Sequence, residues 1–426
     1  MSMIVKADGV AERTKLQAMR TRAAQKNEDI ERIVRSVLEN VREYGYEAVR
    51  KYSVGYDHCQ PYEIPLQRLD EAYRACPPAL IAALEHAAAN IRDYNQKLLA
   101  QSAQWTSPDG GCVGRIVRGL TRVGIYVPGG TAAYPSSVLM NAIPAKVAGV
   151  EEIVMVTPPT EYLNDGVLAA AKIAGVDRVI AVGGAQAIAA LTYGAGFIPQ
   201  VDKVVGPGNA FVATAKRLVY GTVDIDMVAG PSEVLIIADE SANPKYIAAD
   251  LLSQAEHDKL ACAMLLTDSP KLAAAVEEQL AAQLGQLERA EIAQASMADF
   301  GAIIVCQTLQ QCVQLANEIA PEHLELMTED PRQLLAGVKN AGAVFLGAHT
   351  PEALGDYLAG PPHVLPTSGT ARFFSPLSVD AFLKTMSVIE FDRGMLEPIS
   401  QKIITLAESE KLTAHANSIR VRFEQG

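Results

Sequence analysis

Residues 151–182 read EEIVMVTPPTEYLNDGVLAAAKIAGVDRVIAV, and they carry the pattern that decides the fold. Two short runs of apolar residues, IVMV at 153–156 and VIAV at 179–182, flank an amphipathic stretch at 165–175. A strand, a helix and a second strand in this order form a βαβ unit, in which the two strands are parallel. The stretch therefore predicts a parallel sheet covered by at least one helix.

The same alternation continues on both sides of this unit. Apolar runs that predict further strands are VGIYV, KVVG, VLIIA, AMLLT, AIIVC, LELM and VFLG. Predicted helices separate them, at residues 136–149, 185–195, 210–219, 270–284, 308–319 and 330–340. Repeated βα units imply mostly parallel sheets with helices on both faces, and there are enough units for two sheets. The predicted fold class is therefore α/β.

The beginning and the end of the chain have a different character. Residues 12–104 predict mainly helix, because apolar residues recur near a 3.6-residue period across 27–52 and again across 69–99. From Thr350 a long segment rich in Gly, Pro, Ser and Thr follows, and loops of this length are usually functional or disordered. Its buried-looking apolar residues favour function. A last helix is expected at 396–410.

Composition narrows the class of protein. Hydrophobic residues make up 49% of the 426 residues, which is typical of soluble globular proteins. The formal net charge of -12 argues against a nucleic-acid or membrane binder, which would need a basic face. The first residues, MSMIVKADGVAERTK, contain no apolar signal core, and we expect a cytoplasmic chain. The 6 cysteines show no CxxC spacing and are interpreted as free thiols.

Four glycine-rich turns are predicted at the carboxyl ends of strands, where open α/β sheets bind their ligands. They are Pro128-Gly129-Gly130, Gly183-Gly184, Gly206-Pro207-Gly208-Asn209 and Gly230-Pro231-Ser232. Glycine lets a backbone approach a ligand closely, and the N-terminus of a following helix favours a phosphate. The alternative is that tight βα turns simply need glycine, and none of the four turns matches GxGxxG. A dinucleotide site is thus one of two interpretations.

The stretch Leu251–Asp258, LLSQAEHD, closes a helix predicted at 243–257 and places Gln254 and His257 three residues apart. Positions i and i+3 share one face of a helix, so an amide oxygen and an imidazole can point to the same place. Both groups are acceptable ligands for zinc. The alternative is a polar helix edge or a hydrogen bond between the two side chains.

Glu322 and His323 follow Pro321, at the end of a predicted helix. Adjacent side chains diverge on a helix or a strand, so the sequence alone does not make the pair a hydrogen-bonded dyad. At the mouth of a strand, however, the two side chains could act on one ligand from two sides. The alternative is a structural Glu–His pair in a loop.

Longer motifs carry a resemblance that covers residues from about 115 to 421. In order they are RVGIYVPGGTAAYPSSVLMNAIPAKVAGV, VGGAQAIAALTYG, VDKVVGPGNAFVATAKRLVYG, DIDMVAGPSEVLIIADE, ADLLSQAEHD, APEHLEL, LGDYLAGPPHVLPTSGTARF and LTAHANSIRVR. The chain resembles the histidinol dehydrogenase family. The resemblance implies oxidation of L-histidinol to L-histidine through L-histidinal, with zinc and two NAD⁺, in histidine biosynthesis.

The resemblance also implies roles for individual positions. The implied zinc ligands are Gln254, His257, Asp356 and His415. His323 corresponds to the general base, and Glu322 to the residue that activates water. Substrate contacts are implied for Ser232, His363 and Glu410, together with His323 and the four zinc ligands. NAD contacts are implied for Tyr126, Gln186 and Asn209.

An assembly and a domain division follow from the same resemblance. In the family, the residues matching Glu410 and His415 come from the other subunit, so we expect a homodimer with shared active sites and one zinc per subunit. Two incomplete Rossmann-like domains are expected, one inserted in the other, with a helical N-terminal part and a C-terminal arm. The expected divisions are 1–121 for the N-terminal part, 122–232 for the inserted domain with the NAD-contacting turns, 233–376 for the continuation carrying zinc and catalytic residues, and 377–426 for the arm.

One position departs from the family pattern, because Pro362 stands where Asn is more usual. Two alternatives stay open. The first is a related zinc- and NAD-dependent dehydrogenase of another small polar alcohol, although the presence of His363, Glu410 and His415 favours histidinol. The second is a non-catalytic α/β protein that binds a nucleotide-like ligand, which zinc content and turnover would distinguish.

Overall fold

Two six-stranded sheets form the framework of the protein, here seen in a computed structural model. The structure describes residues 3–24, 28–129, 134–159, 163–228 and 230–424. Contacts divide the chain into two units, of which the first comprises Met1–Leu98 with Leu120–Phe382 and the second Leu99–Gly119 with Leu383–Gly426. Both six-stranded sheets belong to the first unit.

One sheet consists of six parallel strands in the order β1-β12-β11-β10-β13-β14. Their bounds are β1 (Ile4–Lys6), β10 (Glu233–Ala238), β11 (Cys262–Thr267), β12 (Ala302–Val305), β13 (His323–Met327) and β14 (Ala343–Leu346). Successive residues of a strand point to opposite faces, and both faces of this sheet are apolar. This explains why its strands appear in the sequence as continuous apolar runs.

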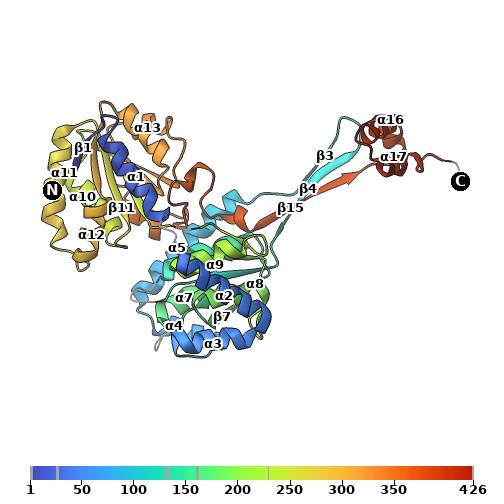
Figure 1. Cartoon of the computed structure of the whole chain (residues 1–426), viewed down its shortest axis with the longest axis horizontal. Coiled ribbons are helices and arrows are strands. Elements are labelled where there is room, and N and C mark those ends of the chain that lie inside the picture. The colour runs from blue at the N-terminus through green and yellow to red at the C-terminus, as the bar shows by residue number, and fades with distance from the viewer. Residues whose placement is uncertain (1–2, 25–27, 130–133, 160–162, 229, 425–426) are drawn as a thin grey trace. The chain divides into compact units, whose positions relative to one another are not determined.

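Helices cover both faces of this sheet (Figure 1). The helices that accompany this sheet along the chain are α1 (Ala11–Ala24), α10 (Pro244–Ala255), α11 (Pro270–Leu284), α12 (Ala290–Phe300), α13 (Leu309–Ile319), α14 (Pro331–Leu335) and α15 (Glu352–Tyr357). Leu235 and Ile237 of β10 belong to the same core cluster as residues of α1 and α13. Val234 and Ile236 belong to a second cluster with α10, α11 and α12. The alternation along β10 therefore fixes which helices lie on which face.

The other sheet has the order β2-β7-β6-β5-β8-β9, and only β2 is antiparallel to its neighbour. Its strands are β2 (Tyr62–Ile64), β5 (Arg122–Tyr126), β6 (Glu152–Thr157), β7 (Arg178–Ala181), β8 (Lys203–Val205) and β9 (Asp224–Ile225). Its helices are α2 (Glu28–Tyr44), α3 (Tyr46–Asp57), α4 (Leu66–Ala75), α5 (Pro78–Leu98), α6 (Pro135–Val147), α7 (Asp165–Ala174), α8 (Gly184–Tyr193) and α9 (Ala210–Val219). Helices α2, α3, α8 and α9 share a core cluster with β6 and β7.

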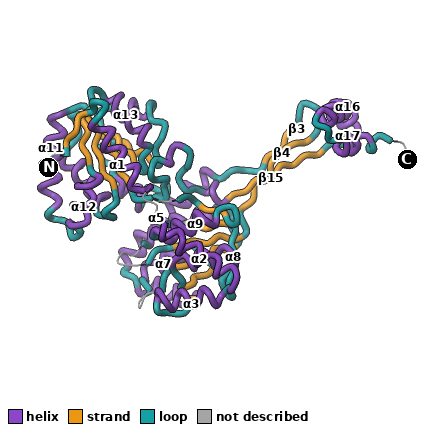
Figure 2. The backbone as a smooth tube through the Cα atoms, in the orientation of Figure 1, coloured by secondary structure: helices purple, strands orange, loops and turns teal. Residues whose placement is uncertain are grey.

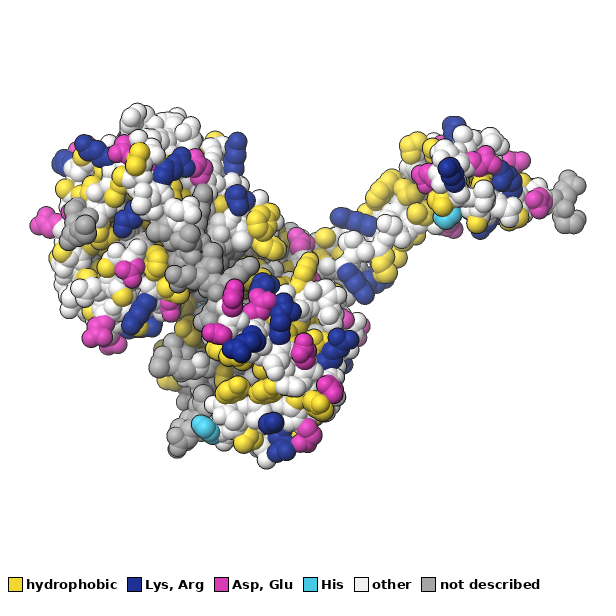
Figure 3. Space-filling view, in the orientation of Figure 1, with side chains coloured by type: hydrophobic (Ala, Val, Ile, Leu, Met, Phe, Trp, Pro, Cys, Tyr) yellow, Lys and Arg dark blue, Asp and Glu magenta, His cyan; other side chains and the backbone are white. Residues whose placement is uncertain are grey.

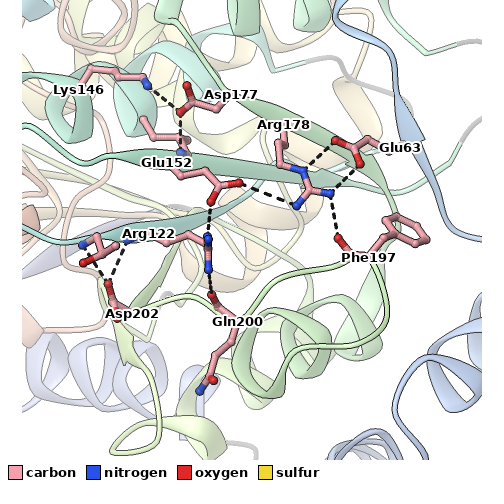
Figure 4. A network of polar contacts seen from close by, with 11 residues as sticks. Glu63, Arg122, Lys146, Glu152, Asp177, Arg178, Phe197, Gln200 and Asp202 are labelled. Carbon is pink, nitrogen blue, oxygen red and sulfur yellow. Dashed lines mark hydrogen bonds and ion pairs between the residues drawn. The ribbon is translucent and has the colours of Figure 1, made fainter.

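A network of charged side chains connects the amino ends of the strands of this second sheet (Figure 4). Arg178 donates to the Glu63 carboxylate at 2.6 and 2.8 Å and to the Phe197 carbonyl at 2.9 Å. Arg122 pairs with Glu152, the first residue of the next strand. The network lies at the edge opposite the glycine-rich turns, so we interpret it as stabilising the sheet rather than as binding a ligand.

The second unit contains a three-stranded antiparallel sheet and a helix pair (Figures 1 and 2). Its elements are β3 (Ala103–Thr106), β4 (Cys112–Gly119), β15 (Leu383–Glu390), α16 (Arg393–Ser409) and α17 (Thr413–Arg420). Only a small cluster around Ile404, Ala407 and Ala416 is buried within the helix pair. Apolar side chains lie exposed along this unit (Figure 3). Trp105 and Ile389 are among the exposed large hydrophobic residues.

The predicted α/β fold class is confirmed, and several local predictions are corrected. The helix expected across 27–52 is broken at Gly45, whose φ of 58° ends α2 before α3 begins. The sequence missed the three strands of the second unit and the short strands β1, β2 and β9, and it missed α12, α15 and α17. All six cysteines are free, as expected. None of the described helices combines the length and the apolar character that a bilayer span requires.

Candidate active site

A cavity of about 430 Å³ lies in the first unit, and residues from both six-stranded sheets line it. Pro128, the turn 206–208 and Asp226 reach it from the carboxyl ends of β5, β8 and β9. Ser232 and His323 reach it from the amino ends of β10 and β13. Its volume falls in the range of small-molecule sites. The two sheets thus contribute opposite edges to one cavity.

This arrangement corrects one expectation. Gly230-Pro231-Ser232 was expected at the carboxyl end of a strand. It instead directly precedes β10, so it lies at the amino end of that strand. The turns at Gly183-Gly184 and at 206–209 do follow β7 and β8 as predicted. Gly130 of the remaining turn lies outside the described residues.

Glu322 and His323 are buried where β13 begins, which confirms their predicted place at a strand mouth. Nδ1 of His323 lies 3.0 Å from the backbone carbonyl of Glu233 and acts there as the donor, because a carbonyl only accepts. In the neutral ring Nε2 then carries the lone pair. Among the described residues no group hydrogen-bonds to this buried Nε2. His323 therefore offers one ring nitrogen that is free to take a proton.

Three carboxyl groups surround this imidazole. Nδ1 lies 3.7 Å from Glu322 Oε2 and 3.8 Å from Glu352 Oε1, and Nε2 lies 3.7 Å from Asp356 Oδ1. Burial alone would lower the pKa of His323, but the Glu352, Glu322 and Asp356 carboxylates together raise it well above its ordinary value.

The carboxyl groups themselves respond differently to this environment. Burial raises the pKa of Glu322 to about 8 and that of Glu352 to about 7. Burial also acts on Asp356, yet the neighbouring His323 outweighs it and lowers the pKa of Asp356. Groups with such separated pKa values are typical of sites that move protons.

Gln254, His257 and Asp356 all line the cavity, although His257 is not on the helix as predicted. Helix α10 ends at Ala255, and the His257 N–H then donates to the Gln254 carbonyl at 3.2 Å in the turn that follows. One end of the Gln254 amide lies 3.3 Å from His257 Nδ1 and 2.5 Å from Glu352 Oε1. The turn still brings the two predicted ligands together.

The groups around Gln254 fit a divalent cation. When the Gln254 amide oxygen points toward His257 and Glu352, that oxygen faces only acceptor atoms, as ligand atoms around a cation do. The opposite amide orientation forms hydrogen bonds with the same atoms, so the amide suits the cavity with or without a cation. Ligand atoms of His323, Glu352 and Asp356 also lie within 4.8 Å of one another, so Asp356 borders two possible ligand groups.

The remaining sequence-predicted residues fall into three places. Ser232 and His363 line the same cavity, and burial lowers the pKa of His363. Tyr126, Gln186 and Asn209 lie at the carboxyl end of the second sheet, but among the described residues they are not part of the cavity lining. Both remaining residues are exposed in the second unit, Glu410 as the residue directly after α16 and His415 on α17.

The three residues with implied NAD contacts each form hydrogen bonds at the carboxyl end of the second six-stranded sheet. The Tyr126 hydroxyl accepts from the Gly184 N–H at 3.2 Å, and burial raises the pKa of Tyr126 to about 12. The Gln186 amide donates to Asp57 at 3.4 Å. Asn209 caps α9 by accepting from two backbone N–H groups at 3.1 and 3.2 Å.

A buried ion pair fixes the turn at Gly206. Lys216 Nζ pairs with Asp226 and donates to the Gly206 carbonyl at 2.8 Å, while the Gly206 N–H donates to Asp226 at 2.8 Å. The two charged side chains are only 3% and 1% exposed. Gly206 has a φ of 107°, and a Cβ there would lie 2.2 Å from the Tyr126 carbonyl oxygen. Only glycine therefore suits this turn.

Replacing Lys216 by methionine should destabilise the protein by about 3 to 5 kcal/mol, because Asp226 would stay buried without its partner. Denaturant unfolding measures the effect. Lys172→Met is the control, since Lys172 pairs with Asp70 at the surface and should cost less than about 1 kcal/mol. Equal unfolding midpoints for the two variants would contradict the role of the buried pair.

Sequence reasoning missed Glu352, although it assigned a function to the segment from Thr350 that contains it. Glu352 opens α15 directly after Pro351, one helical turn before Asp356, so that both carboxylates share one face. Proline before a helix and two acids at i and i+4 were visible in the sequence and could have indicated it.

The fold and the site define an α/β protein with a buried imidazole–carboxyl cavity suited to proton transfer. The model of the histidinol dehydrogenase family matches residues 20–423. Histidinol dehydrogenase from Clostridium acetobutylicum is 50% identical over 412 residues, covering 96% of each chain. The Bacillus cereus protein is 51% identical over 415 residues, covering 97% of each chain. The crystal structure of histidinol dehydrogenase from Elizabethkingia anophelis has a TM-score of 0.93 and 35% identity, and covers 99% of this chain and 98% of that one.

The chain belongs to the histidinol dehydrogenase family, which consists of NAD-dependent oxidoreductases of histidine biosynthesis. The family expectation drawn from the sequence motifs is thereby confirmed.

Proposed function

We propose that this protein oxidises L-histidinol to L-histidine through L-histidinal, with two NAD⁺ and one bound zinc per subunit. The observation that supports this best is the cavity in which the buried residues His323 and Glu322 lie beside Gln254, His257 and Asp356. Membership of the family supports histidinol as the substrate, and the arrangement of the side chains supports the proposed proton transfers.

His323 is the proposed base of the first oxidation. The hydroxyl proton of the alcohol passes to Nε2 while the carbon gives its hydride to the first NAD⁺, which leaves the aldehyde. Because Nδ1 donates its proton to the Glu233 carbonyl, the neutral ring keeps its lone pair on Nε2. This tautomer is the one that the transfer needs.

Glu322 is the proposed base of the second oxidation. Water adds to the aldehyde carbon as one of its protons moves to the carboxylate, and the hydrate then gives a hydride to the second NAD⁺. A carboxyl group with a pKa of about 8 exchanges protons readily near neutral pH. Its Oε2 accepts from the Glu233 N–H at 2.8 Å, which fixes its orientation.

Gln254, His257 and Asp356 are the proposed zinc ligands, and His415 of the partner subunit is the fourth. We assign the zinc to this group rather than to His323, Glu352 and Asp356, because the free Nε2 of His323 has the proton chemistry to perform. When bound, the metal holds the nitrogen atoms of the substrate and offsets the carboxylate charge that raises the pKa of His323.

The remaining contacts complete the proposal. Ser232 and His363 contact the substrate from within the cavity, and Glu410 of the partner subunit is proposed to do so from outside it. Tyr126, Gln186 and Asn209 contact NAD. The active form is a homodimer in the cytoplasm with shared sites, and residues 122–232 form a domain inserted into the one that residues 233–376 continue.

The stoichiometry of the reaction tests the proposed function. Purified protein with zinc, NAD⁺ and histidinol should form two NADH for each histidinol consumed, since the conversion of alcohol to acid removes two hydrides. Starting from histidinal, one NADH should form for each molecule consumed. No turnover of histidinol together with oxidation of another small alcohol would favour the related dehydrogenase. A protein that neither retains zinc nor responds to it would favour a non-catalytic binding protein.

A further inference from the structure

Helix α15 begins without a local cap. It carries Glu352 and Asp356, yet the residue before it is Pro351, whose side chain accepts no hydrogen bond. The Glu352 N–H instead donates at 2.9 Å to Oε1 of Glu325, a residue of β13 that is 27 positions away. A side chain from the sheet therefore does what a capping residue ordinarily does at the start of a helix.

Glu325 occupies an apolar layer of its sheet. It is 1% exposed, and its neighbours on the adjacent strands are Ile236 and Phe345. A carboxyl group in such a place is costly unless hydrogen bonds satisfy both of its oxygens. A residue that served packing alone would be apolar here, as Leu324 and Leu326 are on the opposite face.

The carboxyl group that interacts with Glu325 from the helix side is that of Asp250 on α10. Two carboxylates contain no donor, so among the described residues Oε2 has no partner until one proton is shared between them. Burial raises the pKa of Asp250 to about 6 and that of Glu325 well above its ordinary value, which favours a shared proton. Asp250 lies one helical turn before Gln254, so the carboxyl pair connects α15 to the part of α10 that borders the cavity.

We infer that the carboxyl pair of Glu325 and Asp250 positions α15 against α10, and thereby sets the spacing between Asp356 and Gln254. This inference rests on the proposed function in one respect, namely that these two residues hold the metal. A helix of six residues is not stable alone, so its place depends on tertiary contacts. Two contacts hold α15 in place. One is the hydrogen bond from the Glu352 N–H to Glu325, and the other is the close packing of Gly355 against the Phe345 ring.

Two substitutions of Glu325 separate positioning from bulk packing. In Glu325→Gln the amide oxygen still accepts from the Glu352 N–H and the amide nitrogen donates to Asp250, so zinc affinity should stay within about twofold. In Glu325→Leu both bonds are lost, and zinc affinity should fall by about 10- to 100-fold. Competition with a chelator on the full-length protein measures both affinities.

Hydrogen exchange on metal-free protein provides a readout that needs no activity. Amides of residues 352–357 should exchange at least about tenfold faster in Glu325→Leu, and at the original rate in Glu325→Gln. Glu12→Leu is the control, because Glu12 is also buried and its two carboxylate oxygens accept the Gly9 N–H at 2.9 and 3.0 Å, but it does not line the cavity. It should lower stability without changing zinc affinity or exchange at 352–357.

A variant on the other helix keeps the inference testable if Glu325→Leu does not fold. Asp250→Leu leaves the bond to Glu352 in place but removes the link to α10, so zinc affinity should fall while exchange at 352–357 stays slow. Wild-type zinc affinity in folded Glu325→Leu, or equal losses in the Gln and Leu variants, would overturn the inference. If unmodified protein neither binds zinc nor oxidises histidinol, the proposed function fails, and the exchange experiment still decides the role of the pair.

Discussion

Replacement of His323 by asparagine is expected to reduce turnover of histidinol by about 100- to 10,000-fold, the range attributed to a general base. Asparagine keeps a donor for the Glu233 carbonyl but has no nitrogen that accepts a proton at neutral pH. Zinc content should stay at the original level, because His323 is not among the proposed ligands. Steady-state rates with NAD⁺ and metal analysis of the same preparation measure the two quantities.

His349→Asn is the matched control for this substitution. His349 is exposed and packs beside Tyr246, with ring centroids 6.3 Å apart, and it does not line the cavity. Its replacement should leave turnover unchanged. Ordinary turnover by His323→Asn would remove His323 from the role of base, and loss of zinc from that variant would place it among the ligands.

Mixing two inactive variants, Asp356→Ala and His415→Ala, should restore activity to at most about a quarter of the original level in a twofold-symmetric dimer. Random exchange makes half of the dimers hybrid, and each hybrid has one site with both residues intact. The intact site combines Asp356 of one subunit with His415 of the other. Activity after mixing and subunit exchange measures the recovery.

The matched control combines Asp356→Ala with Gln254→Ala. Both residues lie in the first unit of the chain, so every site of a hybrid dimer lacks one of them. No recovery is expected from this mixture. If the first mixture also stays inactive although tagged subunits demonstrably exchange, the two residues do not act on one site across subunits.

The features that could be predicted from the sequence have local signals. Apolar runs such as VIAV and VLIIA give parallel strands because both faces of each sheet are buried, whatever the rest of the chain does. Pro321 ends α13 and leaves Glu322 and His323 at the start of a strand. The family motifs then identified the chain as a whole.

The features that sequence reasoning missed depend on distant partners. Strand β4 pairs with β15, but nothing in the local sequence of residues 112–119 indicates that 383–390 is the partner strand. Glu325 and Asp250 resemble surface acids until the fold buries them. The end of α10 at Ala255 has no glycine or proline to mark it, so His257 was placed on the helix.

The place of His323 on β13 has a consequence for how such a protein can diverge. Backbone pairing holds this residue on both sides, next to Val234 of β10 and Ala343 of β14. By contrast, α15 is six residues long, lies outside the sheet and is held by a few contacts with β13 and β14. Substitutions in the neighbouring strands would displace His323, the proposed proton acceptor, whereas changes on α15 would reshape the cavity around it. New substrate preferences are therefore expected to arise on the short helix, while the sheet preserves the reaction.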